Sequence, residues 1–137
     1  MGGAAVVIIG YEVNNSAMDA YIEQHKQNLN LDPKTKSIRN ASYIDYRKLL
    51  RHFEEVTSTQ ITLAHIDGPT GNSTYYYLCC FTDSTYNFMW NCEDVMKRVV
   101  PEKFTEVIAP LGTDHIVKRV FASCGVLFSF DVDGNAV

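Results

Sequence analysis

The apolar positions along the chain recur at two spacings, and these spacings predict strands that alternate with helices. Residues 4–9 form a continuous run rich in β-branched side chains, which is typical of a strand buried on both faces. From residue 18 to residue 25 the apolar positions recur every three or four residues, which predicts a helix that Asn15 or Ser16 can cap. The chain therefore opens as a strand followed by a helix.

The same patterns continue through the rest of the chain. Apolar runs bounded by turn residues predict strands, and stripes of helical period that follow a capping residue predict helices. The remaining strands are expected at residues 38–44, 61–66, 75–81, 104–109 and 126–132, and the remaining helices after the caps Asp45, Ser84 and Thr113, the last ending at Gly125.

Strands separated by helices of this length are typical of the α/β class. We expect one domain over residues 1–137, with a mostly parallel sheet of about six strands and helices on both faces. The connection over residues 67–74 does not fit, because a parallel crossover needs a dozen residues or more. Eight extended residues reach only about 27 Å. An antiparallel neighbour is easier at this point, so a mixed sheet is expected.

The composition is that of an ordinary globular domain, with 46% hydrophobic and 20% charged residues. It excludes a disordered chain, a collagen-like repeat and a small disulfide scaffold. No apolar run approaches the eighteen or so residues that span a membrane, so we expect no membrane association. Cys79 and Cys80 lie inside an apolar run and are expected to be buried thiols. The expected compartment is therefore intracellular, cytoplasmic or nuclear.

Charge is distributed unevenly along the chain. The formal net charge is −4, but residues 1–52 sum to +2 and residues 53–137 to −6. A basic stretch of this kind can contact phosphate or an acidic partner, and a solvated surface is the alternative. The candidate RNA-binding residues are Lys34, Lys36, Arg39, Arg47, Lys48 and Arg51.

Acidic residues lie at or just after several predicted strand ends. In an open α/β sheet this is the rim where ligands bind, and clustered carboxylates there can hold Mg²⁺ or Mn²⁺. Each acid also has a structural explanation as a helix cap or turn residue. If the strand after residue 74 is antiparallel, Asp67 and Asp83 fall about 20 Å apart and cannot share a metal. The metal-ligand candidates are Glu12, Asp45, Asp67 and Asp83, of which Glu12, Asp45 and Asp83 are the catalytic candidates.

Other motifs are weaker. The chain contains no phosphate-binding loop, dinucleotide fingerprint, nucleophile elbow or zinc-protease motif. The run Tyr75-Tyr76-Tyr77 can stack on nucleic-acid bases. Consecutive strand residues alternate faces, so at most two of these rings share a surface, and packing in the core is favoured.

Four segments, taken in order, resemble a known family. They read VVIIGYEVNN, SIRNASYIDYRKLLRHF, ITLAHIDG and YYYLCCFTDSTYNFMW, and they resemble NYN domains, a branch of the PIN-like ribonuclease superfamily. The chain departs from the family at Gly10, where a catalytic Asp is expected, and at Thr85, where a second acid is lost. The helix that carries a Lys and an Asp in the family has only residues 67–74 in its place.

The resemblance implies a three-layer PIN/NYN-like sandwich with a degraded catalytic site and no bound cofactor. Such a domain would act in RNA metabolism by binding RNA, a protein partner or a second copy of itself. One alternative is an active metal-dependent ribonuclease that uses Mg²⁺ or Mn²⁺ with Glu12, Asp45 and Asp83. Another is an unrelated α/β scaffold or dimerisation domain.

Overall fold

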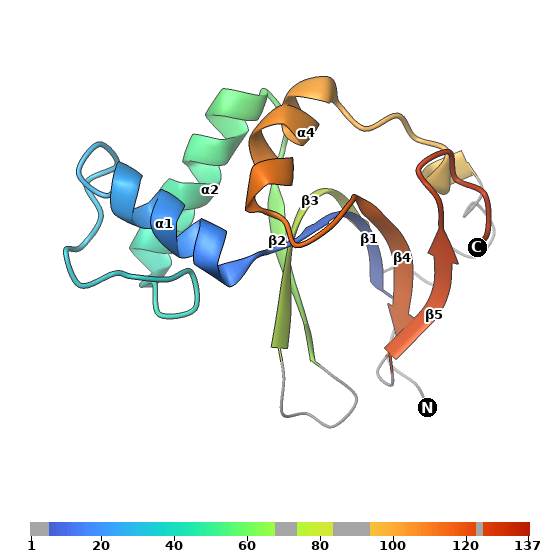
Figure 1. Cartoon of the computed structure of the whole chain (residues 1–137), viewed down its shortest axis with the longest axis horizontal. Helices are drawn as coiled ribbons and strands as arrows, with labels where there is room; N and C mark the ends of the chain where they lie inside the picture. The colour runs from blue at the N-terminus through green and yellow to red at the C-terminus, as the bar shows by residue number, and fades with distance from the viewer. Residues whose placement is uncertain (1–5, 68–73, 84–93, 123–124) are drawn as a thin grey trace.

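Helices gather on one side of a strongly curved sheet (Figure 1). The computed structural model describes residues 6–67, 74–83, 94–122 and 125–137. The elements, in order, are β1 (Val6–Glu12), α1 (Asn15–His25), α2 (Tyr43–Thr57), β2 (Thr62–Asp67), β3 (Thr74–Asp83), α4 (Glu102–Ile108), the short 3-10 helix η1 (Ala109–Leu111), β4 (Val117–Ala122) and β5 (Gly125–Phe130).

The five strands form one sheet in the order β2-β3-β1-β4-β5. Every neighbouring pair in it is antiparallel. The expected mostly parallel sheet of about six strands is therefore wrong, and so is the PIN/NYN-like sandwich. The short connection after Asp67 does join antiparallel neighbours, as its length predicted.

Helices on both faces were also expected, and the described helices lie on one face only. Side chains from α1, α2 and α4 share one core cluster with Tyr11 of β1 and Leu78 of β3. Met96 packs against Val7 and Ile9, which lie on the same face of β1 as Tyr11. The opposite face is built from strand side chains alone among the described residues: Ile8, Tyr77, Cys79, Val117 and Phe121.

Three predicted elements have the wrong type. Residues 38–42 are irregular and residues 43–44 already belong to α2, so the expected strand at 38–44 is absent. Residues 104–109, expected as a strand, fall mainly in α4, where Phe104 and Ile108 are buried one helical turn apart. Most of the helix expected after Thr113 is β4. The expected helix start at Ser84 lies outside the described residues.

The first two helices begin as the local sequence dictates. Asn14, rather than Asn15 or Ser16, caps α1, and its side chain accepts a hydrogen bond from the Ala17 N–H. Ser42, rather than Asp45, caps α2. No helix in the described part of the chain is long and apolar enough to cross a membrane.

A β-bulge interrupts the pairing of β1 with β3. Ile9 lies opposite Phe81 and Gly10 lies opposite Cys79, so Cys80 is an extra residue in β3. A side chain at Gly10 is excluded, because its Cβ would lie 2.3 Å from the Leu78 carbonyl oxygen. As a result, Cys80 and Phe81 both pack on the helix side of the sheet.

Lys118 is a buried cation on β4 and is 1% exposed. Its Nζ donates to the carbonyl oxygens of Met96 at 2.6 Å, Arg98 at 3.0 Å and Val132 at 2.8 Å. All three ammonium donors therefore have an acceptor. Burial lowers the pKa of Lys118, and neighbouring Cys80 and acidic side chains oppose that shift. This side chain joins β4 to two irregular segments.

Asp45 is a buried acid in the first turn of α2 and is 3% exposed. Its Oδ2 accepts from the Asp32 N–H at 3.0 Å and from the Thr35 hydroxyl at 2.6 Å. The carboxylate thus holds the loop between α1 and α2 against the start of α2.

Candidate functional site

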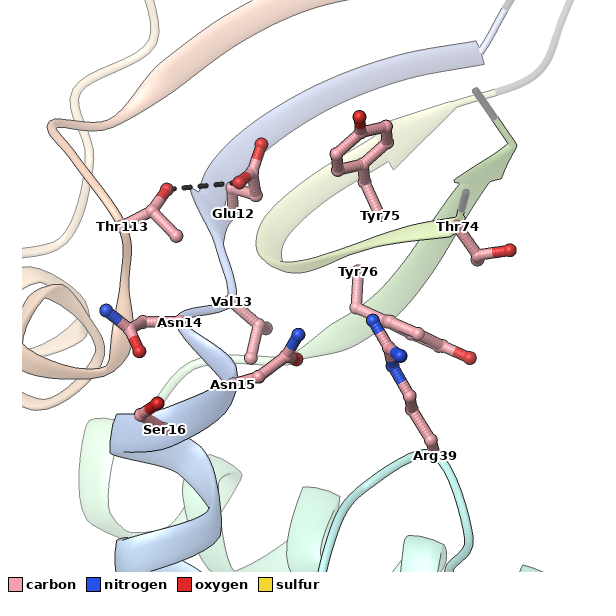
Figure 2. Close-up of a pocket in the computed structure, with 10 residues that line it drawn as sticks. All are labelled: Glu12, Val13, Asn14, Asn15, Ser16, Arg39, Thr74, Tyr75, Tyr76 and Thr113. Atoms are coloured by element: carbon pink, nitrogen blue, oxygen red, sulfur yellow. Dashed lines mark hydrogen bonds between the residues drawn. The ribbon is translucent and has the colours of Figure 1, made fainter. Parts of the chain in front are cut away.

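The main candidate site is an open pocket of about 610 Å³ where β1 ends and α1 begins (Figure 2). The start of β3, the loop before α2 and the turn before β4 complete its walls. Its lining is mostly polar, with two tyrosines and one arginine. The lining residues are Glu12, Val13, Asn14, Asn15, Ser16, Arg39, Thr74, Tyr75, Tyr76 and Thr113.

Backbone hydrogen bonds fix the floor of the pocket. The Val13 N–H donates to the Tyr76 carbonyl at 2.7 Å, and the Asn14 N–H donates to the Leu111 carbonyl at 2.7 Å. The chain then turns directly into α1, so Asn15 and Ser16 stand at the positive end of the helix dipole. The Asn14 side chain accepts from the Ala17 N–H at 3.1 Å, and Asn15 and Ser16 line the pocket.

Arg39 and Tyr76 form one side of the pocket. The guanidinium carbon of Arg39 lies 5.8 Å from the centroid of the Tyr76 ring, within the range of a cation–π contact (Figure 2). Arg39 is exposed and forms no ion pair with any described residue. Its charge is therefore available to a ligand. Tyr76 is half-buried against the core and His65.

Glu12 and Tyr75 form the other side. Glu12 Oε2 accepts a hydrogen bond from the Thr113 hydroxyl at 3.3 Å, and the Thr113 N–H donates to the Glu12 carbonyl at 2.9 Å. Tyr75 is 44% exposed. Tyr77, on the same face of β3, is buried. Burial and the Glu12 carboxylate raise the pKa of Tyr77, and Arg119 opposes them.

The four acidic candidates do not converge. From the strand register, the Cα atoms of Glu12 and Asp67 lie about 14 Å apart, since three residues and two strand spacings separate them. β3 ends at Asp83 on the opposite rim, about 30 Å along the strand from the residue paired with Asp67. The Asp45 carboxylate instead accepts hydrogen bonds from the loop between α1 and α2. No group of three metal-ligating side chains occurs among the described residues.

The six basic candidates are dispersed over the loop before α2 and over α2 itself. Arg39 alone lines the pocket. Lys48 is committed to the Asn30 carbonyl at 2.8 Å. The exposed residues Lys34 and Lys36 belong to the loop, and Arg47 and Arg51 are exposed on α2.

Sequence reasoning missed most of the pocket lining. Tyr76 and Arg39 are 37 positions apart, and no local pattern connects them. Asn15 and Ser16 were recognised only as helix caps, although the start of a helix directly after a strand is a signal for a site at that rim. Comparison with protein-family models, with curated proteins and with solved structures found no match for this chain.

Proposed function

We propose that this chain is a binding module for single-stranded RNA, with the pocket at the β1–α1 junction as its central subsite. The observation that supports the proposal is the Arg39–Tyr76 pair at the mouth of a polar pocket. A guanidinium over a ring offers its own plane as a stacking surface for a base and a charge for the adjacent phosphate.

The chemistry of the remaining lining is compatible with a nucleotide. The N-terminal end of α1 favours an anion. The Glu12 carboxylate on the far side accepts hydrogen bonds and would repel a phosphate, so a sugar hydroxyl or a base N–H suits that position. Tyr75 presents a second exposed ring on the other face of β3 (Figure 2). A strand crossing this rim would therefore meet one aromatic ring on each side.

The surroundings of the pocket add charge. Residues 26–51 contain seven basic and two acidic residues, and one of those acids, Asp45, is buried. The first turn of α2, four residues after Arg39, presents Tyr43 at 74% exposure, and Arg47 and Arg51 follow on the same helix. Because the whole chain has a net charge of −4, the electrostatic attraction for RNA comes from this local basic surface alone.

The scattered acids give no support to a metal-dependent ribonuclease, because no group of three metal-ligating side chains occurs among the described residues and the Cα atoms of Glu12 and Asp67 lie about 14 Å apart. The proposed role is therefore binding without cleavage. All neighbouring strands in the described part of the chain are antiparallel, which removes the structural basis for kinship with NYN domains.

Fluorescence anisotropy with a short labelled single-stranded RNA tests the proposal. Tyr76→Leu should weaken binding by about five- to 150-fold, since stacking is worth about 1–3 kcal/mol per base, whereas Tyr76→Phe should retain it. Arg39→Gln should weaken binding and reduce the salt slope by about one. Lys103→Gln, at an exposed position of α4 outside the pocket, is the matched control. No binding at low salt, or equal effects of Arg39→Gln and Lys103→Gln, would overturn the proposal.

A further inference from the structure

One carboxylate faces the pocket at the β1–α1 junction. Glu12 is the single acid among the described residues that line this pocket, and it is half-buried. It forms no ion pair with any described residue. The Thr113 hydroxyl and N–H hold its side chain and its backbone carbonyl, at 3.3 and 2.9 Å. The wall of the pocket therefore holds a fixed hydrogen-bond acceptor that no described cation neutralises.

This carboxylate lies next to an exposed aromatic ring. Glu12 is directly opposite Tyr77 in the register of β1 with β3. Tyr75, two residues from Tyr77, is thus the diagonal neighbour of Glu12 on the same face, with Cα atoms about 7–8 Å apart. Figure 2 shows Glu12 and Tyr75 on one side of the rim and Arg39 on the other. A base stacked on Tyr75 places its sugar within reach of Glu12.

The chemistry of a nucleic-acid backbone decides what a carboxylate can bind there. Carboxylate oxygens accept hydrogen bonds and do not donate them. Within a strand, the phosphate, ester and sugar-ring oxygens are also acceptors, and the 2′-hydroxyl of ribose is the one donor of the sugar–phosphate backbone. Deoxyribose lacks this donor. An acid that faces the backbone is therefore satisfied by RNA and left without a partner by DNA.

We propose that Glu12 is the specificity-determining residue of this pocket and selects RNA over DNA by accepting a hydrogen bond from a 2′-hydroxyl. The inference rests on the proposed function, since it assigns a role within the same site. An N–H on a base edge is the competing donor, but its position changes from base to base. The 2′-hydroxyl has the same position in every ribonucleotide, and stacking on Tyr75 is equally tolerant of sequence.

Fluorescence anisotropy with three labelled strands tests the preference in the wild-type chain. RNA, DNA and 2′-O-methyl RNA of one sequence, made of adenine and cytosine only, present the same bases, and the last two lack the donor. RNA should bind about tenfold more tightly than either, because hydrogen bonds to a charged group are among the strong ones. Equal affinity for all three strands, or a base preference that persists in the 2′-O-methyl strand, would overturn the inference.

Glu12→Leu assigns the preference to this side chain. It removes the acceptor, so the affinities for RNA and DNA should differ by less than about twofold. Glu106→Leu, at an exposed acid of α4 outside the pocket, is the matched control and should keep the wild-type ratio. An undiminished preference in Glu12→Leu would overturn the inference and leave the proposed function standing. No binding of any strand by the wild-type chain would overturn both.

Discussion

Two buried charges hold irregular parts of this molecule, and they do so over different distances. Asp45 accepts from Asp32 and Thr35, which lie in the loop just before its own helix. Lys118 donates to carbonyls of three residues that are 14 to 22 positions away. The carboxylate therefore organises a local loop, whereas the ammonium fastens distant segments to the sheet. This difference predicts unequal costs when each is removed.

Lys118→Met should have the largest effect. The methionine fills a similar volume but leaves three carbonyl oxygens without a donor, and each buried unsatisfied group costs about 1–3 kcal/mol. We expect the free energy of unfolding in urea to fall by about 3–5 kcal/mol. Lys103→Met, at an exposed position on α4, should change it by less than about 0.5 kcal/mol. A similar small change for both would show that the Lys118 contacts contribute little.

Asp45→Ala should cost less, about 2 kcal/mol, because only one N–H and one hydroxyl lose their acceptor. The same urea titration measures it, with Asp19→Ala on the exposed side of α1 as the control. A loss as large as that of Lys118→Met would contradict the distinction between a local and a long-range contact.

Gly134→Ala tests the surroundings of Lys118 without removing the charge. Gly134 has φ +88°, and an added Cβ would lie 2.6 Å from the Met96 carbonyl oxygen that Lys118 binds. The backbone strain alone should cost about 1–2 kcal/mol in the urea titration. Gly112→Ala should cost less, since its nearest neighbours are side-chain atoms of Tyr11 at 3.1 Å. Equal costs would show that the Gly134 turn adapts freely.

The smallest expected effect is a decrease in the free energy of unfolding at acidic pH, which involves His52 of α2. His52 of α2 contacts the Tyr21 hydroxyl through Nε2 at 2.5 Å and lies near the His25 ring. Burial, and then the nearby His25, lower the pKa of His52, and Glu55 opposes them. The fold therefore favours neutral His52, so its contribution is present above the unfolded pKa of about 6.5 and is lost as the pH falls through the lower folded value.

We expect the free energy of unfolding of the wild-type chain to decrease over this range and the decrease to be shallower in His52→Gln. His115→Gln, at a histidine that is exposed beside β4, is the control for the removal of one imidazole. A wild-type slope that neither substitution alters would mean that other groups set the acid sensitivity.

The sequence predicted the elements that have a continuous apolar run between turn residues or a helical stripe after a capping residue. β1, α1, α2, β2 and β3 all occur near their expected positions. The segment that became β4 could not be assigned this way, because Val117, Val120 and Phe121 have a helical spacing. In the structure these residues are buried on opposite faces of the sheet, with Lys118 buried between them. Both faces of a central strand are covered, so the alternation that marks a strand is lost.

The candidate site was predictable only in part. Glu12 and Arg39 were selected by their charge and do line one pocket. The convergence of Glu12 with Asp45, Asp67 and Asp83 depended on parallel strands whose ends share a rim. Strand direction depends on long-range pairing, and only the length of the 67–74 connection gave information about it.

The extra residue at Cys80 places two consecutive side chains of β3 on the same face of the sheet. Phe81 faces the helices, where the Arg98 guanidinium lies 4.3 Å above the ring. A strand without the extra residue would keep the pairs Ile9–Phe81 and Gly10–Cys79 in regular alternation, with Phe81 still facing the helices. The bulge therefore adds one more side chain, that of Cys80, to the helix-side core without altering the pairing before or after it.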